Sequence, residues 1–176
     1  MLELLLAAAT LGLSGGLSPG PLLALVVTET MARGRSAGLA VAAAPLLTDG
    51  PIIAVTILLL NRIEESHSAL GALSLVGAGL LATYGVAAMR TVSIDLDQLE
   101  AEPRVWQALA KGVSANLFNP SPYHFWLAIG APLLLRAYQI GIAAVICFLA
   151  FFYIGLVGSK GLLAVLVSRS REVLQG

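Results

Sequence analysis

The chain has 176 residues, of which 58% are hydrophobic and 11% are charged, and its mean hydropathy is +0.90. Soluble domains carry about 25% charged residues, so this composition excludes a water-soluble globule and predicts an all-α integral membrane protein. The formal net charge is zero, which argues against nucleic acid as a partner. Cys147 is the only cysteine, which excludes an internal disulfide and a Cys-x-x-Cys redox pair.

Apolar stretches follow one another along the chain, each long enough to cross a bilayer, which takes about 20 mainly apolar residues. Five of them are expected, at about residues 2–27, 37–60, 69–89, 108–135 and 138–167. The most polar segment, residues 91–107, holds a run of acidic side chains and is expected to be a cytoplasmic linker. It separates a first half, residues 1–90, from a second half, residues 108–176.

The first and fourth apolar stretches are each interrupted by a pair of prolines. The interruptions are Ser18-Pro19-Gly20-Pro21 and Asn119-Pro120-Ser121-Pro122. Proline lacks the backbone N–H and clashes with the carbonyl four residues back, so a regular helix cannot continue through either segment. In a bilayer, irregular backbone persists only where it is buried in protein or lines a cavity. A broken helix in each half therefore predicts a transport site near the middle of the membrane.

The two halves match in outline when Pro19 is aligned with Pro120. Each begins with a broken helix and continues with a long helix and a short polar turn. A repeat of three crossings is odd-numbered, so its second copy enters the membrane from the opposite face, as in the inverted repeats of secondary transporters. By this alignment the chain ends where a sixth helix would begin. We expect a truncation, with a natural five-helix protein as the alternative, and a second copy of the chain is a candidate partner to cover the open face.

Lysine and arginine placement predicts the orientation, because cytoplasmic loops carry an excess of both. With the N-terminus outside the cell, Arg33, Arg35, Arg90, Arg104, Lys111, Arg169 and Arg171 all lie on the cytoplasmic side. Only Arg62 and Arg136 then lie outside, and Lys160 is left unassigned. We therefore expect a multi-pass protein of the plasma membrane with its N-terminus outside.

Asp49 is the most informative single residue, because a carboxylate near the centre of a membrane helix costs roughly 2.5–3.5 kcal/mol on insertion scales. Such residues face the interior of the helix bundle and mark the path of a substrate, an ion or a proton. We expect Asp49 to couple proton movement to transport. The alternative is that Asp49, assisted by Thr48, only caps a half-helix begun at Pro51.

The broken helices free backbone N–H and C=O groups at membrane depth, and the helix that resumes at Pro21 presents the positive end of its dipole. The candidate substrate-binding residues are Ser18, Pro19, Gly20, Pro21, Asn116, Asn119 and Pro120. The alternatives are a proline kink used for packing and amides that only satisfy the broken backbone. His124 is expected to be a packed or interfacial residue. Glu29 and Arg33, four residues apart on one helix face, are expected to form a surface ion pair.

The sequence lacks a Gly-rich phosphate loop and a His-Glu-x-x-His motif. It therefore predicts a transporter rather than an enzyme, with no cofactor and no cluster of metal-ligating residues.

Several of these segments resemble the LysE/RhtB-type amino-acid exporters. The resemblance is carried by residues 18–21, by Arg33-Gly34-Arg35-Ser36-Ala37-Gly38, by Asp49 in the second apolar stretch, and by the segment from Lys111-Gly112 to Asn119-Pro120. It implies a six-helix, two-repeat protein that exports small solutes, basic or neutral amino acids in known members, against inward proton flow. Typical members have Gly where Thr48 stands here and often Lys where Ser121 follows Asn-Pro.

The leading hypothesis is a proton-coupled exporter of a small zwitterionic or cationic solute, namely an amino acid, with the proton and membrane lipid as further partners. In this mechanism the two repeats rock to expose the site to either side. A divalent metal-cation exporter is the first alternative, since Asp49, freed carbonyls and Asn oxygens are hard ligands. A membrane subunit that only scaffolds partners is the second.

Overall fold

The computed structural model describes residues 1–63 and 105–175, and these residues form helices with no strand among them. The helices are α1 (Leu2–Leu17), α2 (Pro21–Arg33), α3 (Arg35–Ala42), α4 (Pro45–Ile63), α6 (Val105–Leu117), α7 (Pro120–Phe125), the π-helix η2 (Trp126–Gly130), α8 (Ala131–Ile140) and α9 (Ile142–Gln175). The predicted apolar stretch 69–89 and most of the linker 91–107 lie outside the described residues. The prediction of an all-α protein is confirmed for the described part.

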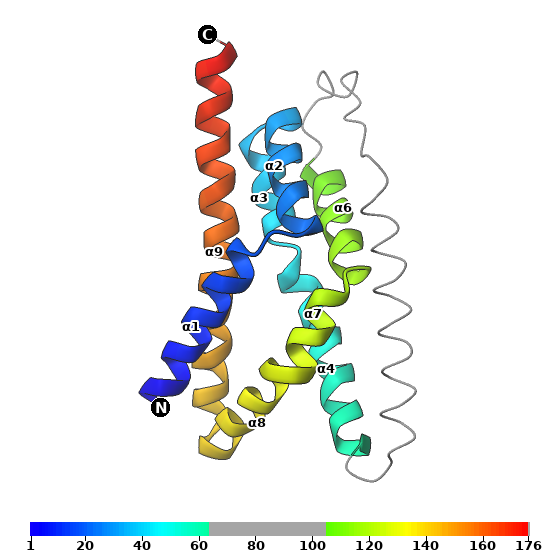
Figure 1. Cartoon of the computed structure of the whole chain (residues 1–176), viewed down its shortest axis with the longest axis vertical. Helices are drawn as coiled ribbons and strands as arrows, with labels where there is room; N and C mark the ends of the chain where they lie inside the picture. The colour runs from blue at the N-terminus through cyan, green and yellow to red at the C-terminus, as the bar shows by residue number, and fades with distance from the viewer. Residues whose placement is uncertain (64–104, 176) are drawn as a thin grey trace.

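Two of the described stretches are long and apolar enough to cross a membrane, namely Arg35–Leu58 and Ile142–Ser170. The bent pair α1–α2 makes a third if it is counted as one span. The helices run roughly along the long axis of the molecule, with the N-terminus near the lower end and the C-terminus at the upper end (Figure 1). Five crossings and the inverted repeat stay predictions.

The first predicted break is confirmed, because α1 and α2 are separated by a short extended segment and bent by 60°. Ser18 has φ −60° and ψ 126°, and Gly20 has φ −174° and ψ 176°. Pro21 opens α2 at the first helical position, where the missing N–H removes no helical hydrogen bond. The two prolines therefore act as expected and place irregular backbone in the middle of the molecule.

The second predicted break is confirmed between α6 and α7. Asn119 is extended at φ −84° and ψ 125°, and its side-chain oxygen accepts a hydrogen bond from the Ser121 N–H at 3.1 Å. Pro120 opens α7 as Pro21 opens α2. Asn119 thus satisfies part of the broken backbone, as one of the sequence interpretations held.

The stretch expected to cross the membrane over 37–60 is confirmed as a candidate span at Arg35–Leu58. Within it the chain is divided into α3 and α4 at Ala43–Ala44, because Pro45 opens a new helix. One predicted boundary is wrong. The fourth stretch was expected to end near 135, yet α8 continues to Ile140. The chain then turns at Gly141, whose φ of 143° is readily adopted by glycine but rarely by other residues. The long helix α9 then runs without interruption through the small residues near 155–161. Its 34 residues make it about 50 Å long, and it extends past α2 and α3 (Figure 1).

Helices α1 and α9 pack closely through glycine. An added Cβ at Gly155 would lie 2.8 Å from the Leu13 N and 3.0 Å from the Ala9 O of α1, and a Cβ at Gly12 would meet the carbonyl of Phe152. Small residues that let two backbones approach are the usual contact between helices in membranes. This contact fixes α1, and with it the first break, against α9.

Replacing Gly155 by Ala should destabilise the protein by about 1–3 kcal/mol, because the methyl group has no room at the α1–α9 contact. Gly158→Ala is the matched control, since Gly158 lies on the same helix and a Cβ there meets nothing within 4 Å. Alanine should gain up to about 1 kcal/mol at that position from helix propensity. Unfolding in mixed detergent micelles measures both, and equal effects at the two sites would contradict this packing.

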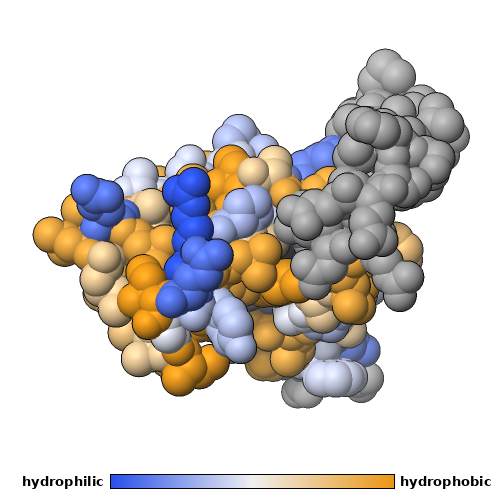
Figure 2. Space-filling model, turned by 90° about the horizontal axis from the view of Figure 1, so that it is seen from below, coloured by the Kyte–Doolittle hydropathy of each residue, from blue (hydrophilic) through white to orange (hydrophobic). Residues whose placement is uncertain are grey.

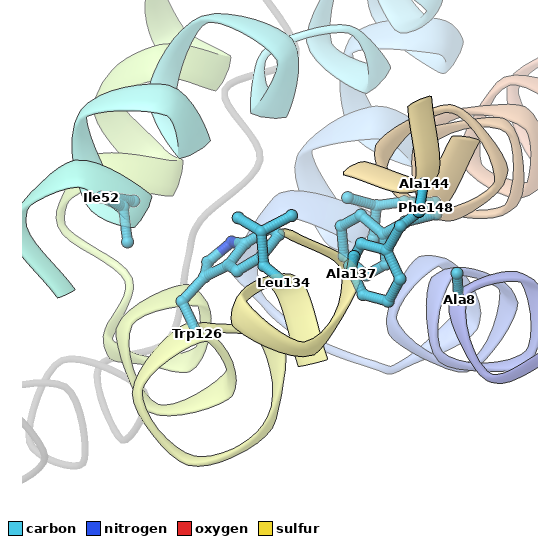
Figure 3. Packing of buried hydrophobic residues seen from close by; sticks show 9 residues of the cluster. Ala8, Ile52, Trp126, Leu134, Ala137, Ala144 and Phe148 are labelled. Atoms are coloured by element: carbon cyan, nitrogen blue, oxygen red, sulfur yellow. The ribbon is translucent and has the colours of Figure 1, made fainter. Parts of the chain in front are cut away.

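The buried apolar side chains form two clusters. One lies between α1, α4, η2, α8 and α9 and consists of Ala8, Ile52, Trp126, Leu134, Ala137, Ala144, Phe148, Phe152 and Leu156. In Figure 3 the Trp126 ring lies beside Leu134, and Phe148 lies close to Ala144. The other cluster joins α2, α3, α6 and α9 and consists of Leu22, Val26, Ala37, Val41, Ala42, Ala44, Ala108 and Ala164.

The outer surface of the described helices is largely apolar. Leu6, Ile146, Ile154 and Leu162 are among the large hydrophobic side chains that are exposed. Hydrophobic residues cover much of the described surface seen from the lower end of the molecule (Figure 2). Exposed apolar surface of this extent marks a protein whose helices face lipid.

Candidate functional site

The two helix breaks meet at one cavity of about 340 Å³. Its lining comes from both halves of the chain, because α1, α2 and α4 contribute on one side and α6, α7, η2 and α9 on the other. The polar residues of its wall are Ser14, Ser18, Asp49, Asn116, Asn119, Ser121 and Lys160. The volume lies at the small end of ligand cavities, which span about 300–1,000 Å³.

Most of the predicted site residues are brought together at this cavity. Ser18, Pro19, Gly20, Asp49, Asn116 and Asn119 all line it. Pro21 and Pro120 do not, and they are instead the first residues of α2 and α7. Their contribution is to begin the helices that follow the breaks. The functional roles of all these residues stay predictions.

Asp49 lies in the second turn of α4, buried to 3% exposure. Its Oδ1 accepts hydrogen bonds from Asn116 Nδ2 at 3.2 Å and from Thr48 Oγ1 at 3.4 Å. The interpretation that Asp49 caps a half-helix begun at Pro51 is wrong, because α4 begins at Pro45 and continues through Pro51. The carboxylate therefore faces the cavity from inside a helix.

Asn116 links the two halves of the chain. Its side-chain Nδ2 donates to Thr48 Oγ1 at 2.6 Å as well as to Asp49, which lie on α4, while Asn116 itself lies on α6. The hydroxyl of Thr48 has a single proton, which is shared between the Ala44 carbonyl at 3.2 Å and the Asp49 Oδ1 at 3.4 Å. The side-chain N–H groups of Asn116 thus bind the Thr48–Asp49 pair, whereas Asn119 serves the broken backbone.

Lys160 is the site residue that the sequence interpretation left unassigned. It lies on α9 at 4% exposure, lines the cavity, and donates from Nζ to the carbonyls of Gly15 and Gly16, both at 3.0 Å. These carbonyls are at the C-terminal end of α1, the negative end of its dipole, where a cation is favourable. The sequence could have identified Lys160 as a site residue, because it lies inside the apolar stretch 138–167. Inserting a lysine into a membrane helix is about as costly in free energy as inserting an aspartate.

Aromatic side chains form the apolar wall of the cavity. The ring centroids of Trp126 and Phe152 are 5.3 Å apart in an edge-to-face arrangement, and those of Phe125 and Phe152 are 5.1 Å apart and stacked. The side chains of Trp126 and Tyr153 also lie near the Asp49 carboxylate. His124, expected to be packed or interfacial, is exposed and is not among the lining residues, so it is not packed.

Glu29 forms a second group of charges outside the cavity lining. The predicted ion pair with Arg33 is present at 3.5 Å, but Glu29 is buried to 5% exposure, so its description as a surface pair is wrong. Its Oε1 also accepts from Lys111 Nζ at 2.7 Å, across from α6. The sequence interpretation missed this partner because Lys111 is 82 residues away along the chain.

Comparison with known proteins assigns the chain to a family. The chain itself matches no curated protein and no solved structure. The model of the LysE type translocator family matches residues 13–176, a range that contains both helix breaks, Asp49 and Lys160. This match confirms the resemblance that the two breaks indicated. The chain therefore belongs to the LysE type translocator family.

Proposed function

We propose that this membrane translocator exports amino acids from the cell in exchange for protons. The observation that supports the proposal most strongly is the cavity between the two broken helices, which carries one buried carboxylate, Asp49, and is lined by both halves of the chain. A site between two halves can be opened to either side when the halves rock against each other.

Asp49 is proposed to exchange a proton for the solute. In the solute-bound form its carboxylate binds the ammonium group of the amino acid, and in the return step it carries a proton inward. The hydrogen bonds from Asn116 and Thr48 hold the carboxylate at the cavity wall in both steps. Because Asn116 belongs to the second half, a change at Asp49 is transmitted to the contact between the halves.

The topology proposed for this mechanism has the N-terminus outside and five crossings in two inverted repeats, in the plasma membrane. Helix α4 ends near the lower end of the molecule and α6 begins near the upper end (Figure 1). The N-terminus and the C-terminus also lie toward opposite ends, which agrees with an odd number of crossings. With this orientation, Lys111 and the paired Glu29 and Arg33 lie toward the cytoplasm.

Lys160 argues against the alternative of a divalent metal-cation exporter. Its ammonium is a fixed positive charge in the wall of the same cavity that holds Asp49. A divalent cation bound to Asp49 would be repelled by that charge. A zwitterionic solute instead has a group suited to each charge.

The proposal is tested in proteoliposomes with an acidic interior and an internal pH dye. Adding L-leucine, L-threonine, L-lysine or L-arginine outside should raise the internal pH for at least one of them, because uptake of the solute drives protons out. Cadmium should have no effect. A response to cadmium alone would establish a metal exporter, and silence across the whole panel would favour a scaffold.

A further inference from the structure

The cavity holds two opposite charges that are not joined in an ion pair. Asp49 and Lys160 both line it, and no ion pair joins them within 4 Å. Among the described residues, the ion pairs all involve Glu29, so neither cavity charge has a charged partner there. A buried charge without a partner is costly. Two such charges in one cavity therefore indicate a ligand that forms an ion pair with each of them.

The ammonium of Lys160 has one N–H donor left for a ligand. An ammonium has three N–H donors, and two of them are engaged by the Gly15 and Gly16 carbonyls. These two neutral acceptors fix the position of Nζ at the end of α1, and no carboxylate in the described part of the chain forms an ion pair with it within 4 Å. The third donor remains for an anionic group in the cavity.

Asp49 shows the complementary arrangement. Its hydrogen bonds come from the neutral donors Asn116 and Thr48, so the negative charge is held in place without being cancelled. A molecule with an ammonium at one end and a carboxylate at the other can satisfy both charges at once.

We propose that Lys160 is the residue that binds the carboxylate of the transported solute, while Asp49 binds its ammonium. The inference rests on the proposed function and adds a specificity-determining residue to it. Lys160 makes the protein select amino acids over the corresponding amines. A role limited to tying down the end of α1 would give no such selection.

The test compares solutes that differ only in the carboxylate. L-leucine is paired with 3-methylbutylamine and L-lysine with cadaverine, and binding is followed by the fluorescence of Trp126, which lines the cavity, in a Trp106→Phe background. Wild type should bind at least one amino acid more tightly than its amine. Lys160→Gln should weaken binding of that amino acid roughly 10- to 100-fold, the loss of one charge-assisted hydrogen bond. It should not weaken binding of the amine, which loses only the repulsion from the Lys160 ammonium.

Two further variants separate binding from structure. Glutamine retains N–H donors for the Gly15 and Gly16 carbonyls, and Lys160→Arg, which also keeps the charge, should keep the preference for the amino acid. Lys111→Gln removes the same charge outside the cavity lining and should leave the preference as in wild type. Equal weakening of amino acid and amine in Lys160→Gln would overturn the inference.

Two further results test the roles of Lys160 and Asp49 separately. If Lys160→Gln does not fold, the wild-type comparison is sufficient, because equal binding of an amino acid and its amine would overturn the role of Lys160. Asp49→Asn should weaken the amine and spare 4-methylpentanoate, which has a carboxylate and no ammonium. Failure of that result alone counts against the role of Asp49 in the proposed function, and absence of binding by every probe overturns both proposals.

Discussion

Asp49→Asn should abolish solute-driven proton movement, reducing it at least about 100-fold. In the solute-bound form the Asp49 carboxylate is paired with the ammonium of the solute. Removing one charge of a buried ion pair costs roughly 3–5 kcal/mol, which corresponds to a decrease of more than about 100-fold in the equilibrium constant for binding. The variant also lacks the group that carries the proton. Asparagine has the size of aspartate and an oxygen that can accept from Asn116, so the contact between α4 and α6 is retained. The internal pH dye in proteoliposomes measures the effect.

The matched control for this variant is Glu3→Gln. Glu3 is an exposed carboxylate in the first turn of α1, away from the cavity lining, and it undergoes the same chemical change. Its proton flux should equal that of wild type. Equal flux in Asp49→Asn and wild type would show that another group carries the proton.

Trp126→Ala should cause the largest loss of stability, roughly 3–5 kcal/mol. The indole is completely buried, and it packs edge to face against Phe125 and Phe152 with ring centroids 5.3 Å from each. In a membrane the gain from removing apolar surface from water is small, so the loss comes mainly from the cavity and the missing dispersion contacts. The free energy of unfolding in mixed detergent micelles measures it.

Trp106→Ala provides the comparison within the same chain. Trp106 is 74% exposed at the start of α6, and its removal should change stability by less than about 1 kcal/mol. If the two tryptophans proved equally important, the apolar cluster around Trp126 would not be the core of this half of the protein.

The sequence predicted the features that depend on local chemistry. Pro19, Pro21 and Pro120 predicted where the helices break, because proline acts on its own turn of helix. Asp49 was found because a charge in an apolar stretch is costly wherever the chain folds. These two signals predicted that irregular backbone and a carboxylate would form a site, and the structure brings them to one cavity.

The features that depend on tertiary contact were missed. Lys160 carries the same signal as Asp49, but its acceptors on α1 lie 144 and 145 residues away, and no local pattern identifies them. Glu29 has one partner four residues away, which the helical spacing predicted, and another on α6, which it did not. Pro51 resembled a helix start, yet α4 continues through it from Pro45.

The central claim is that the transported solute occupies the cavity between the two breaks. Ser18 lines that cavity and is exposed, so Ser18→Cys in a Cys147→Ser background offers one thiol for labelling. A transported amino acid should slow labelling at this position, and it should not slow labelling of Ser170→Cys, which lies exposed near the end of α9. Transport that continues while labelling at Ser18→Cys is unaffected by the solute would contradict the account.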